Sequence, residues 1–194
     1  MQGVIAEQLT RRRLGGAALV LGGLAVAAVV LLPKIGGGDR AASTPSVRLV
    51  SVPQLGLAFA HPRSWKRTVD GRVIRVRSPD GTAVVTLSSP VAGRHSKAVK
   101  AALLRGLKQR LKEVSVLREG RGRLGTRTVD SVEVSGFGET RRVRALGLVG
   151  STSYRTYAVT VLTPLHPSEK RLAEVARILA TVRLTKPRSV GKRR

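Results

Sequence analysis

The sequence predicts an α+β domain carried behind a single N-terminal transmembrane helix, with an antiparallel β-sheet sandwiched between two main helices. Three observations lead to this prediction: one long apolar stretch near the N-terminus, a series of short extended segments separated by turn residues, and two stretches with helical apolar spacing. Strands, a helix, four strands and a second helix follow one another, which is not the strict alternation of a doubly wound sheet. The length of 194 residues allows one such domain plus an appendage.

The apolar stretch at residues 14–32 contains no polar side chain. As a helix, its 19 residues would approach the roughly 30 Å thickness of the bilayer hydrocarbon. Arg11, Arg12 and Arg13 directly precede it and predict that residues 1–13 form a short cytoplasmic arm. A cleaved signal peptide is the alternative, but the apolar core of such a peptide usually spans only about 7–15 residues. We therefore expect a single-pass plasma-membrane anchor with the rest of the chain outside the cytoplasm.

The remaining chain divides into a linker, a folded domain and a tail. Residues 33–46 are rich in Gly, Pro, Ser and Ala, which is typical of a flexible linker. Residues 185–194 are basic and contain Pro and Gly, so we expect a disordered tail. Residues 47–184 are left as an extracytoplasmic domain that is large enough for one hydrophobic core.

The first part of that domain has the pattern of a sheet. An extended segment at residues 56–60 leads towards Trp65, which we expect to fill the core. Residues 73–77 alternate apolar and basic side chains, as half-buried strands do. A Pro-Asp-Gly turn at residues 79–81 then indicates a hairpin into a strand that begins at Ala83.

Two helices and four strands complete the domain. In residues 96–112, apolar side chains recur every four positions, at Val99, Leu103, Leu107 and Leu111. Residues 168–182 carry a second apolar stripe with helical spacing. The four extended segments between the helices are residues 114–118, 129–135, 141–149 and 156–163. Their close spacing favours antiparallel neighbours, because parallel strands need a crossover of about a dozen residues or more.

Two stretches carry a resemblance to a known family. Residues 56–65 (GLAFAHPRSW) run from a short strand into Pro and Trp, and residues 157–162 (YAVTVL) precede a Pro and a terminal amphipathic helix. With the order of elements, they resemble the PsbP-like superfamily, which includes the extrinsic photosystem II subunit, the Ran-binding Mog proteins and mycobacterial LpqN-type envelope lipoproteins. The resemblance covers about residues 50–184. It implies an antiparallel sheet between helices and a non-catalytic role in binding a partner, with a membrane helix here where the lipoproteins have a lipidated Cys.

The charge balance points to anionic partners. The chain has 36 Lys and Arg against 11 Asp and Glu, for a formal net charge of +25. Arg75, Arg77, Arg142 and Arg144 alternate with apolar neighbours in two predicted strands, and they would form one arginine-rich face if those strands align. Such a face attracts polyanions, which outside a membrane are anionic lipid headgroups and acidic wall polymers. A solvated basic surface without a ligand is the alternative.

Patterns for catalysis, metal binding and cofactor binding are weak. The chain has no Cys, which excludes thiolate chemistry and disulfides. Residues 120–125 match G-x-G-x-x-G, but the residues that follow have the pattern of a turn and a strand, so we expect a Gly-rich hairpin. His61, His95 and His166 lack metal-ligand spacing and are expected at the surface or in turns. We expect no cofactor, no metal site and no enzymatic activity.

These observations predict a membrane-anchored, non-catalytic binding or accessory module of the cell envelope, whose partner is an envelope protein or an anionic polymer. The alternative is an electrostatic binder in which the arginine-rich surface itself holds anionic polymers or lipids. Nucleic acid is not the expected partner, because the chain has a predicted membrane span and only 3% aromatic residues for stacking on bases.

Overall fold

The computed structural model describes residues 46–188. The predicted cytoplasmic arm with Arg11, Arg12 and Arg13, the membrane span at residues 14–32, nearly all of the linker and the end of the tail lie outside the described residues. Among the helices of the described part, none has the length and apolar character needed to cross a membrane. The described chain is α+β, with two antiparallel sheets and two α-helices.

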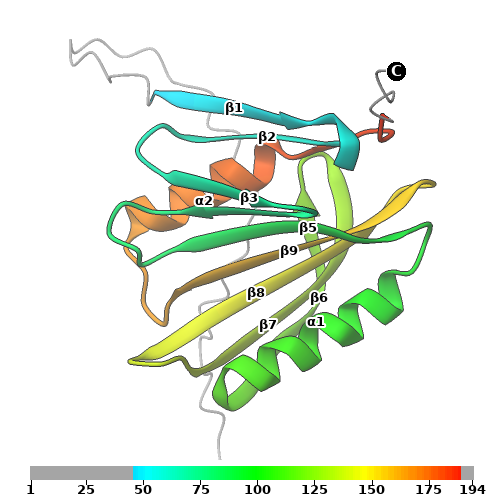
Figure 1. Ribbon diagram of the computed structural model, residues 1–194. Coiled ribbons are helices and arrows are strands. Elements are labelled where there is room, and N and C mark those ends of the chain that lie inside the picture. The colour runs from blue at the N-terminus through cyan, green and yellow to red at the C-terminus, as the bar shows by residue number, and fades with distance from the viewer. Residues whose placement is uncertain (1–45, 189–194) are drawn as a thin grey trace, which may run out of the picture. The chain divides into compact units, whose positions relative to one another are not determined.

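The larger sheet has seven strands in the order β3-β4-β5-β9-β8-β7-β6 (Figure 1). Their bounds are β3 Lys66–Asp70, β4 Val73–Arg77, β5 Val84–Ala92, β6 Lys112–Leu124, β7 Arg127–Phe137, β8 Arg142–Ser151 and β9 Arg155–Pro164. All strands predicted between residues 73 and 163 are confirmed. The Gly-rich segment forms the end of β6 and the turn into β7, as expected of a hairpin.

Helix α1, Ser96–Arg110, packs on one face of this sheet, mainly against β8 and β9. Leu107 and Leu111 are buried against β7 and β8, so the predicted apolar stripe is confirmed. The approach is close, because a Cβ on Gly147 of β8 would lie 2.6 Å from a methyl carbon of Leu103. Glycine at this position therefore sets the distance between the helix and the sheet.

The opposite face is covered by helix α2, Glu169–Thr181, together with a second, three-stranded sheet. The smaller sheet has the order β1-β2-β10, and η1 Pro53–Leu55 connects β1 Val47–Val52 to β2 Leu57–Pro62, while β10 is Arg183–Leu184. Phe59 of β2, Ile178 of α2 and Val159 of β9 belong to one hydrophobic cluster. The prediction of a sheet between two helices is thus confirmed in part, since one outer layer also contains a sheet.

Trp65 is buried in this cluster, as predicted, and its indole N–H donates to Glu174 Oε2 at 3.2 Å. Arg171 of α2 lies over the indole, with its guanidinium carbon 5.3 Å from the ring centroid, and also forms an ion pair with Glu174. The same guanidinium reaches Asp80 Oδ2 at 2.7 Å. Hydrogen bonds, of which the largest contribution comes from Ser78, hold the pKa of Asp80 well below its ordinary value. This network ties α2 to the turn between β4 and β5.

The expectation of a surface or turn position is wrong for His61. It lies within β2, is 1% exposed, and its Nδ1–H donates to the carbonyl oxygen of Pro62 at 2.8 Å. Its Nε2 has no hydrogen-bond partner among the described residues. Side chains alternate along β2, so His61 points to the same buried face as Phe59. The proline that follows it is typical of a turn, and the strand is therefore difficult to predict at this position. His95 and His166 are exposed, as expected.

We expect the free energy of unfolding to fall as the pH is lowered from 7.5 to 5. Burial lowers the pKa of His61, and the positive charges of Arg67 and Arg48 lower it further. In the unfolded chain, His61 is protonated below about pH 6.5, whereas in the folded chain it stays neutral to a lower pH. Protonation therefore stabilises the unfolded state relative to the folded state as the pH falls below that value. Urea denaturation at several pH values measures this loss. In the variant His61→Phe the loss should shrink, and an unchanged pH dependence would contradict the prediction.

Candidate ligand-binding groove

The register of the large sheet separates the four predicted arginines into two pairs. Residues that are paired across neighbouring strands lie on the same face. Arg75 pairs with Thr86, Thr86 with Thr160, and Thr160 with Gly147, which contacts α1. Arg75, and Arg77 two positions further along β4, therefore lie on the α1 side of the sheet.

Arg142 and Arg144 lie on the other side, because both are an odd number of positions from residue 147 on the same strand. Each also has an acidic partner: Arg142 Nη2 is 3.4 Å from Glu113 Oε2, and Arg144 forms an ion pair with Glu133. The guanidinium carbon of Arg142 is in addition 4.6 Å from the ring centroid of Phe137. These two arginines are thus partly neutralised, and they do not extend the surface around Arg75.

A groove of about 570 Å³ lies on the α1 side, between this helix and the strands β5 and β9 that it leaves partly uncovered. The strand residues that line it are Thr86, Ser88, Pro90 and Val91 of β5 and Ala158, Thr160 and Leu162 of β9. Val99, Leu103 and Leu107 of α1 contribute apolar side chains, as does Leu111 directly after the helix. The lining is mostly apolar and has the volume of a small-molecule site.

Small residues on α1 keep the groove open. Ala98, Ala102 and Gly106 follow one another at four-residue spacing and all line it. A Cβ on Gly106 would meet no atom within 4 Å, so the space beside this residue is empty. The apolar stripe next to these residues packs on the sheet, whereas Ala98 and Ala102 are exposed.

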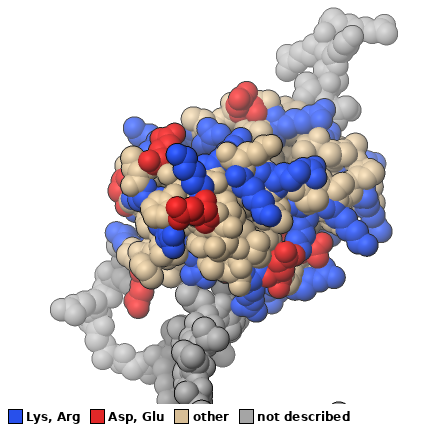
Figure 2. All heavy atoms as spheres, turned by 90° about the horizontal axis from the view of Figure 1, so that it is seen from below, with Lys and Arg blue, Asp and Glu red and all other residues tan. Residues whose placement is uncertain are grey.

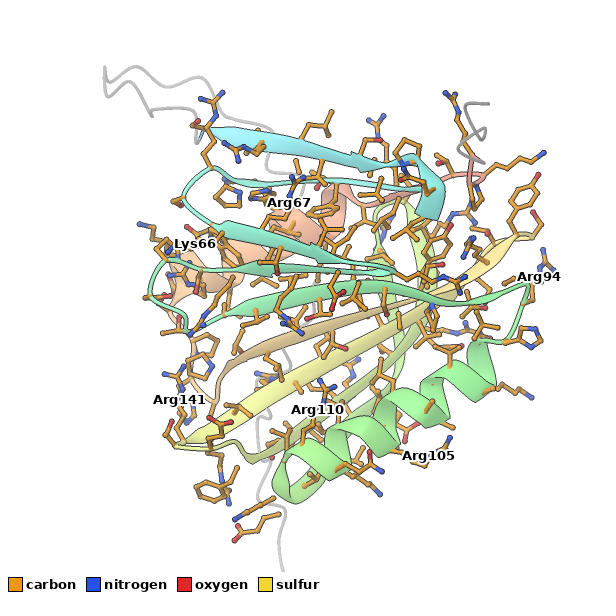
Figure 3. All side chains as sticks on the ribbon, viewed as in Figure 1. Lys66, Arg67, Arg94, Arg105, Arg110 and Arg141 are labelled. Carbon is orange, nitrogen blue, oxygen red and sulfur yellow. The ribbon has the colours of Figure 1, made fainter. Side chains whose placement is uncertain are left out.

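The charged residues that line the groove are Arg105 and Arg110 (Figure 3). Neither forms an ion pair with any residue of the described chain, and no acidic residue lines the groove. Figure 2, which views the domain from below Figure 1, shows Lys and Arg side chains spread over this face, with a few acidic side chains and uncharged residues between them. The groove therefore combines an apolar lining with positive charge that a ligand can neutralise.

The groove offers no group that could transfer a proton at neutral pH. Its polar side chains are hydroxyls and guanidinium groups, and it contains no carboxylate, His or Cys. In the part of the chain that the structure describes, no three His, Asp or Glu side chains come close enough to hold a metal ion. The groups that are present offer apolar contact inside the groove and charge-assisted hydrogen bonds along it.

No protein-family model matches the chain, and no curated protein is similar to it at a significant level. A solved structure from Bacteroides thetaiotaomicron is similar, with 16% identity and a TM-score of 0.51, over 74% of this chain and 49% of that one. The chain thus spans about half the length of that protein. The solution structure of cyanobacterial PsbP from Synechocystis matches with 12% identity and a TM-score of 0.48, over 76% of this chain and 98% of that one.

The apo structure of the immunity protein TplEi of the T6SS from Pseudomonas aeruginosa matches with 13% identity and a TM-score of 0.41, over 71% of this chain and 48% of that one. Of these likenesses, the one to the Bacteroides protein supports the α+β fold and nothing beyond it. A PsbP structure is among the similar ones at low identity, and membership of the PsbP-like superfamily stays a prediction.

Sequence reasoning missed the groove and its two arginines. The pattern of residues 96–112 predicts a helix that packs on a sheet, and nothing in it distinguishes Arg105 and Arg110 from the other basic residues of this helix. The signal that could have found the groove is the row of Ala98, Ala102 and Gly106 beside the apolar stripe, because side chains that small cannot fill a helix–sheet interface.

Proposed function

We propose that the domain is a non-catalytic binding module of the cell envelope, and that the α1 groove holds an anionic amphiphile, such as a lipid with an acyl chain and an anionic headgroup. The observation that carries this proposal is an apolar groove of about 570 Å³ lined by Arg105 and Arg110, with no acidic residue in its lining. An apolar chain would lie against Ala158 and Leu162, and the headgroup would face the guanidinium groups.

The energetics favour this class of ligand over a purely polar one. Each buried methylene contributes about 0.8 kcal/mol, or roughly a fourfold gain in affinity, as long as the groove can accept it. An anionic headgroup adds a charge-assisted hydrogen bond from an arginine that has no acidic partner in the described chain. Arg75, whose strand partner Thr86 lines the groove, adds positive charge to the same side of the sheet.

The placement in the envelope rests on the predicted anchor at residues 14–32, with Arg11, Arg12 and Arg13 on its cytoplasmic side. A domain that follows such an anchor would face the outer leaflet or the wall, where anionic amphiphiles are available. Protease treatment of intact and of permeabilised cells tests this orientation. Cleavage of the domain only after permeabilisation would contradict it.

We expect the variant Gly106→Leu to weaken the binding of octyl sulfonate, an anionic amphiphile that is not a phosphate ester, at least tenfold. The added side chain enters empty space in the groove, so it occupies the ligand's volume without displacing a neighbour. Gly106→Ala is the matched control: it should bind normally and unfold about 0.8–1 kcal/mol less readily, because Ala is the better helix former. Calorimetric titration of a fragment of residues 43–194, first checked for cooperative unfolding, measures both affinities. Equal affinities of the two variants would refute the groove as the site.

The second candidate is a binder of acidic wall polymers, which the net charge of +25 favours. The two candidates differ in their dependence on salt. Binding of polyglutamate should weaken steeply between 50 and about 200 mM salt if charge is the whole interaction. Octyl sulfonate in the groove should lose much less affinity over the same range. Salt-sensitive binding of polyglutamate together with no binding of octyl sulfonate would establish the second candidate instead.

A further inference from the structure

A second pocket lies at the opposite end of β8 from the Arg142 end, and it shares no residue with the groove. Its volume is about 370 Å³. Four segments that are distant in sequence form it: the loop between β5 and α1, the first residue of β7, the turn between β8 and β9, and the segment at residues 184–186. Figure 3 shows Arg94 in the first of these segments, beside the end of the β8–β9 hairpin.

The charges of this pocket are all positive. Arg94, Arg127 and Lys186 line it from three of the four segments, and no acidic residue lines it. All three side chains are exposed, and none forms an ion pair with a residue of the described chain. The positive charges of these three side chains repel each other across the pocket, and a bound anion would offset this repulsion. Lys186 also lies over Tyr154, with its Nζ 5.4 Å from the ring centroid.

Hydrogen bonds fix the turn that forms the hydroxyl-rich wall. Thr152 N–H donates to the carbonyl oxygen of Arg155 at 2.8 Å, and Thr152 Oγ1 accepts from the backbone N–H groups of Tyr154 and Arg155 at 3.2 and 3.1 Å. Ser151 and Ser153 stand on either side of Thr152 and line the pocket. The hydroxyls of Ser151 and Thr152 are engaged within the protein, with Thr156 Oγ1 at 2.9 Å and with the carbonyl oxygen of Arg155 at 3.2 Å. The wall therefore presents the hydroxyl of Ser153 to a ligand, from a turn whose backbone is already held in place.

The loops that carry the cations are held to the same framework. Gly93 N–H donates to the carbonyl oxygen of Tyr154 at 2.8 Å, and Thr156 Oγ1 donates to the carbonyl oxygen of Gly93 at 2.8 Å, so the residue before Arg94 is fixed to the hairpin. On the other side, Thr185 N–H donates to the carbonyl oxygen of Gly56 at 2.8 Å. The positions next to Arg94 and Lys186 are thus set before any ligand binds, which lowers the ordering cost of binding.

We propose that this pocket is a binding site for a phosphate monoester of about the size of a sugar phosphate. A phosphate monoester carries close to two negative charges at pH 7 and three acceptor oxygens, which suits a pocket with three cations and the hydroxyl of Ser153. A volume of about 370 Å³ exceeds that of the phosphate group alone and leaves room for a polar body against Ser153 and Tyr154. Two of the three cations are arginines, whose planar guanidinium binds phosphate through two parallel hydrogen bonds.

The test is a calorimetric titration of the full chain, held in zwitterionic nanodiscs, with glucose 6-phosphate, glucuronate and glucose as probes. We expect saturable binding of glucose 6-phosphate, at least tenfold weaker binding of glucuronate and no binding of glucose. Affinity for glucose 6-phosphate should rise between pH 5 and about pH 7.5, because the phosphate loses its second proton near pH 6. Absence of saturable binding, or equal affinity for glucuronate, overturns the proposal.

Variants separate this pocket from general charge attraction. The double variant Arg94→Gln/Lys186→Gln should lose about tenfold in affinity per removed cation, as expected for hydrogen bonds to a charged group. The matched control Arg63→Gln/Lys170→Gln removes two exposed cations elsewhere on the domain and should keep full affinity. Equal losses in the two double variants, at unchanged melting temperatures, overturn the proposal. Gly106→Leu should bind glucose 6-phosphate normally, so failure of the groove and failure of this pocket give different results.

Discussion

Replacing Gly125 by Ala should lower the free energy of unfolding by about 3 kcal/mol or more. This residue forms the turn between β6 and β7 with a φ of +59°, which costs an L-residue with a side chain about 1–2 kcal/mol. An added Cβ would also lie 2.0 Å from the carbonyl oxygen of Val182, a backbone atom that cannot move aside cheaply. The backbone N–H of Gly125 donates to the carbonyl oxygen of Leu179 at 2.8 Å. A shift of the turn would therefore break the hydrogen bond that joins it to the end of α2.

Gly71→Ala is the matched control for this prediction. Gly71 also has a positive φ, +52°, but a Cβ there would meet no atom within 4 Å. Its substitution should therefore cost only the backbone strain, about 1–2 kcal/mol. Urea denaturation of both variants measures the difference. If the two substitutions cost the same, the contact between the β6–β7 turn and α2 is not as close as the structure has it.

Replacing Phe59 by Ala should cost about 3–5 kcal/mol, the usual range for a fully buried aromatic side chain. Phe59 is 0% exposed and lies in the cluster that joins the small sheet to α2 and to the large sheet. Its loss would leave a cavity in the cluster through which these layers pack. Thermal and urea unfolding should both show a single, shifted transition, because the small sheet shares its core with the rest of the domain.

The control lies on the neighbouring strand. Leu49 of β1 pairs with Ala60, next to Phe59, but its side chain is 75% exposed. Leu49→Ala should change the free energy of unfolding by less than about 0.5 kcal/mol. A small effect of Phe59→Ala, or a separate early transition in that variant, would show that the three-stranded sheet unfolds independently of the large one.

Elements whose side chains alternate between core and solvent could be predicted from the sequence. The stripe of α1 and the strand with Ile74 and Val76 were predicted because burial imposes a period on the sequence. The strand β3 shows no such period, since all of its residues are exposed at the edge of the sheet. The two-residue strand β10 is too short to have a period, and it exists because β2 offers it hydrogen bonds.

The grouping of the candidate site residues could not be predicted, because it depends on register. Whether Arg75 and Arg144 share a face is decided by the pairing of β4 with β5, β5 with β9 and β9 with β8, and a shift of one residue in any pair reverses the answer. The cations of the second pocket, Arg94, Arg127 and Lys186, come from loops and strand ends. Only the folded chain brings such residues together.

The position of β2 between β1 and β10 affects the order in which the domain can fold during its synthesis. Ala60 N–H donates to Thr181 Oγ1 at 2.9 Å across 121 positions of sequence, and β10 pairs with β2 only after α2 is complete. Contacts of such long range form late, since the intervening chain must first be closed into a loop. A ribosome must therefore finish almost the whole domain before the small sheet can close. Until then the nascent polypeptide keeps apolar surface exposed and stays accessible to chaperones.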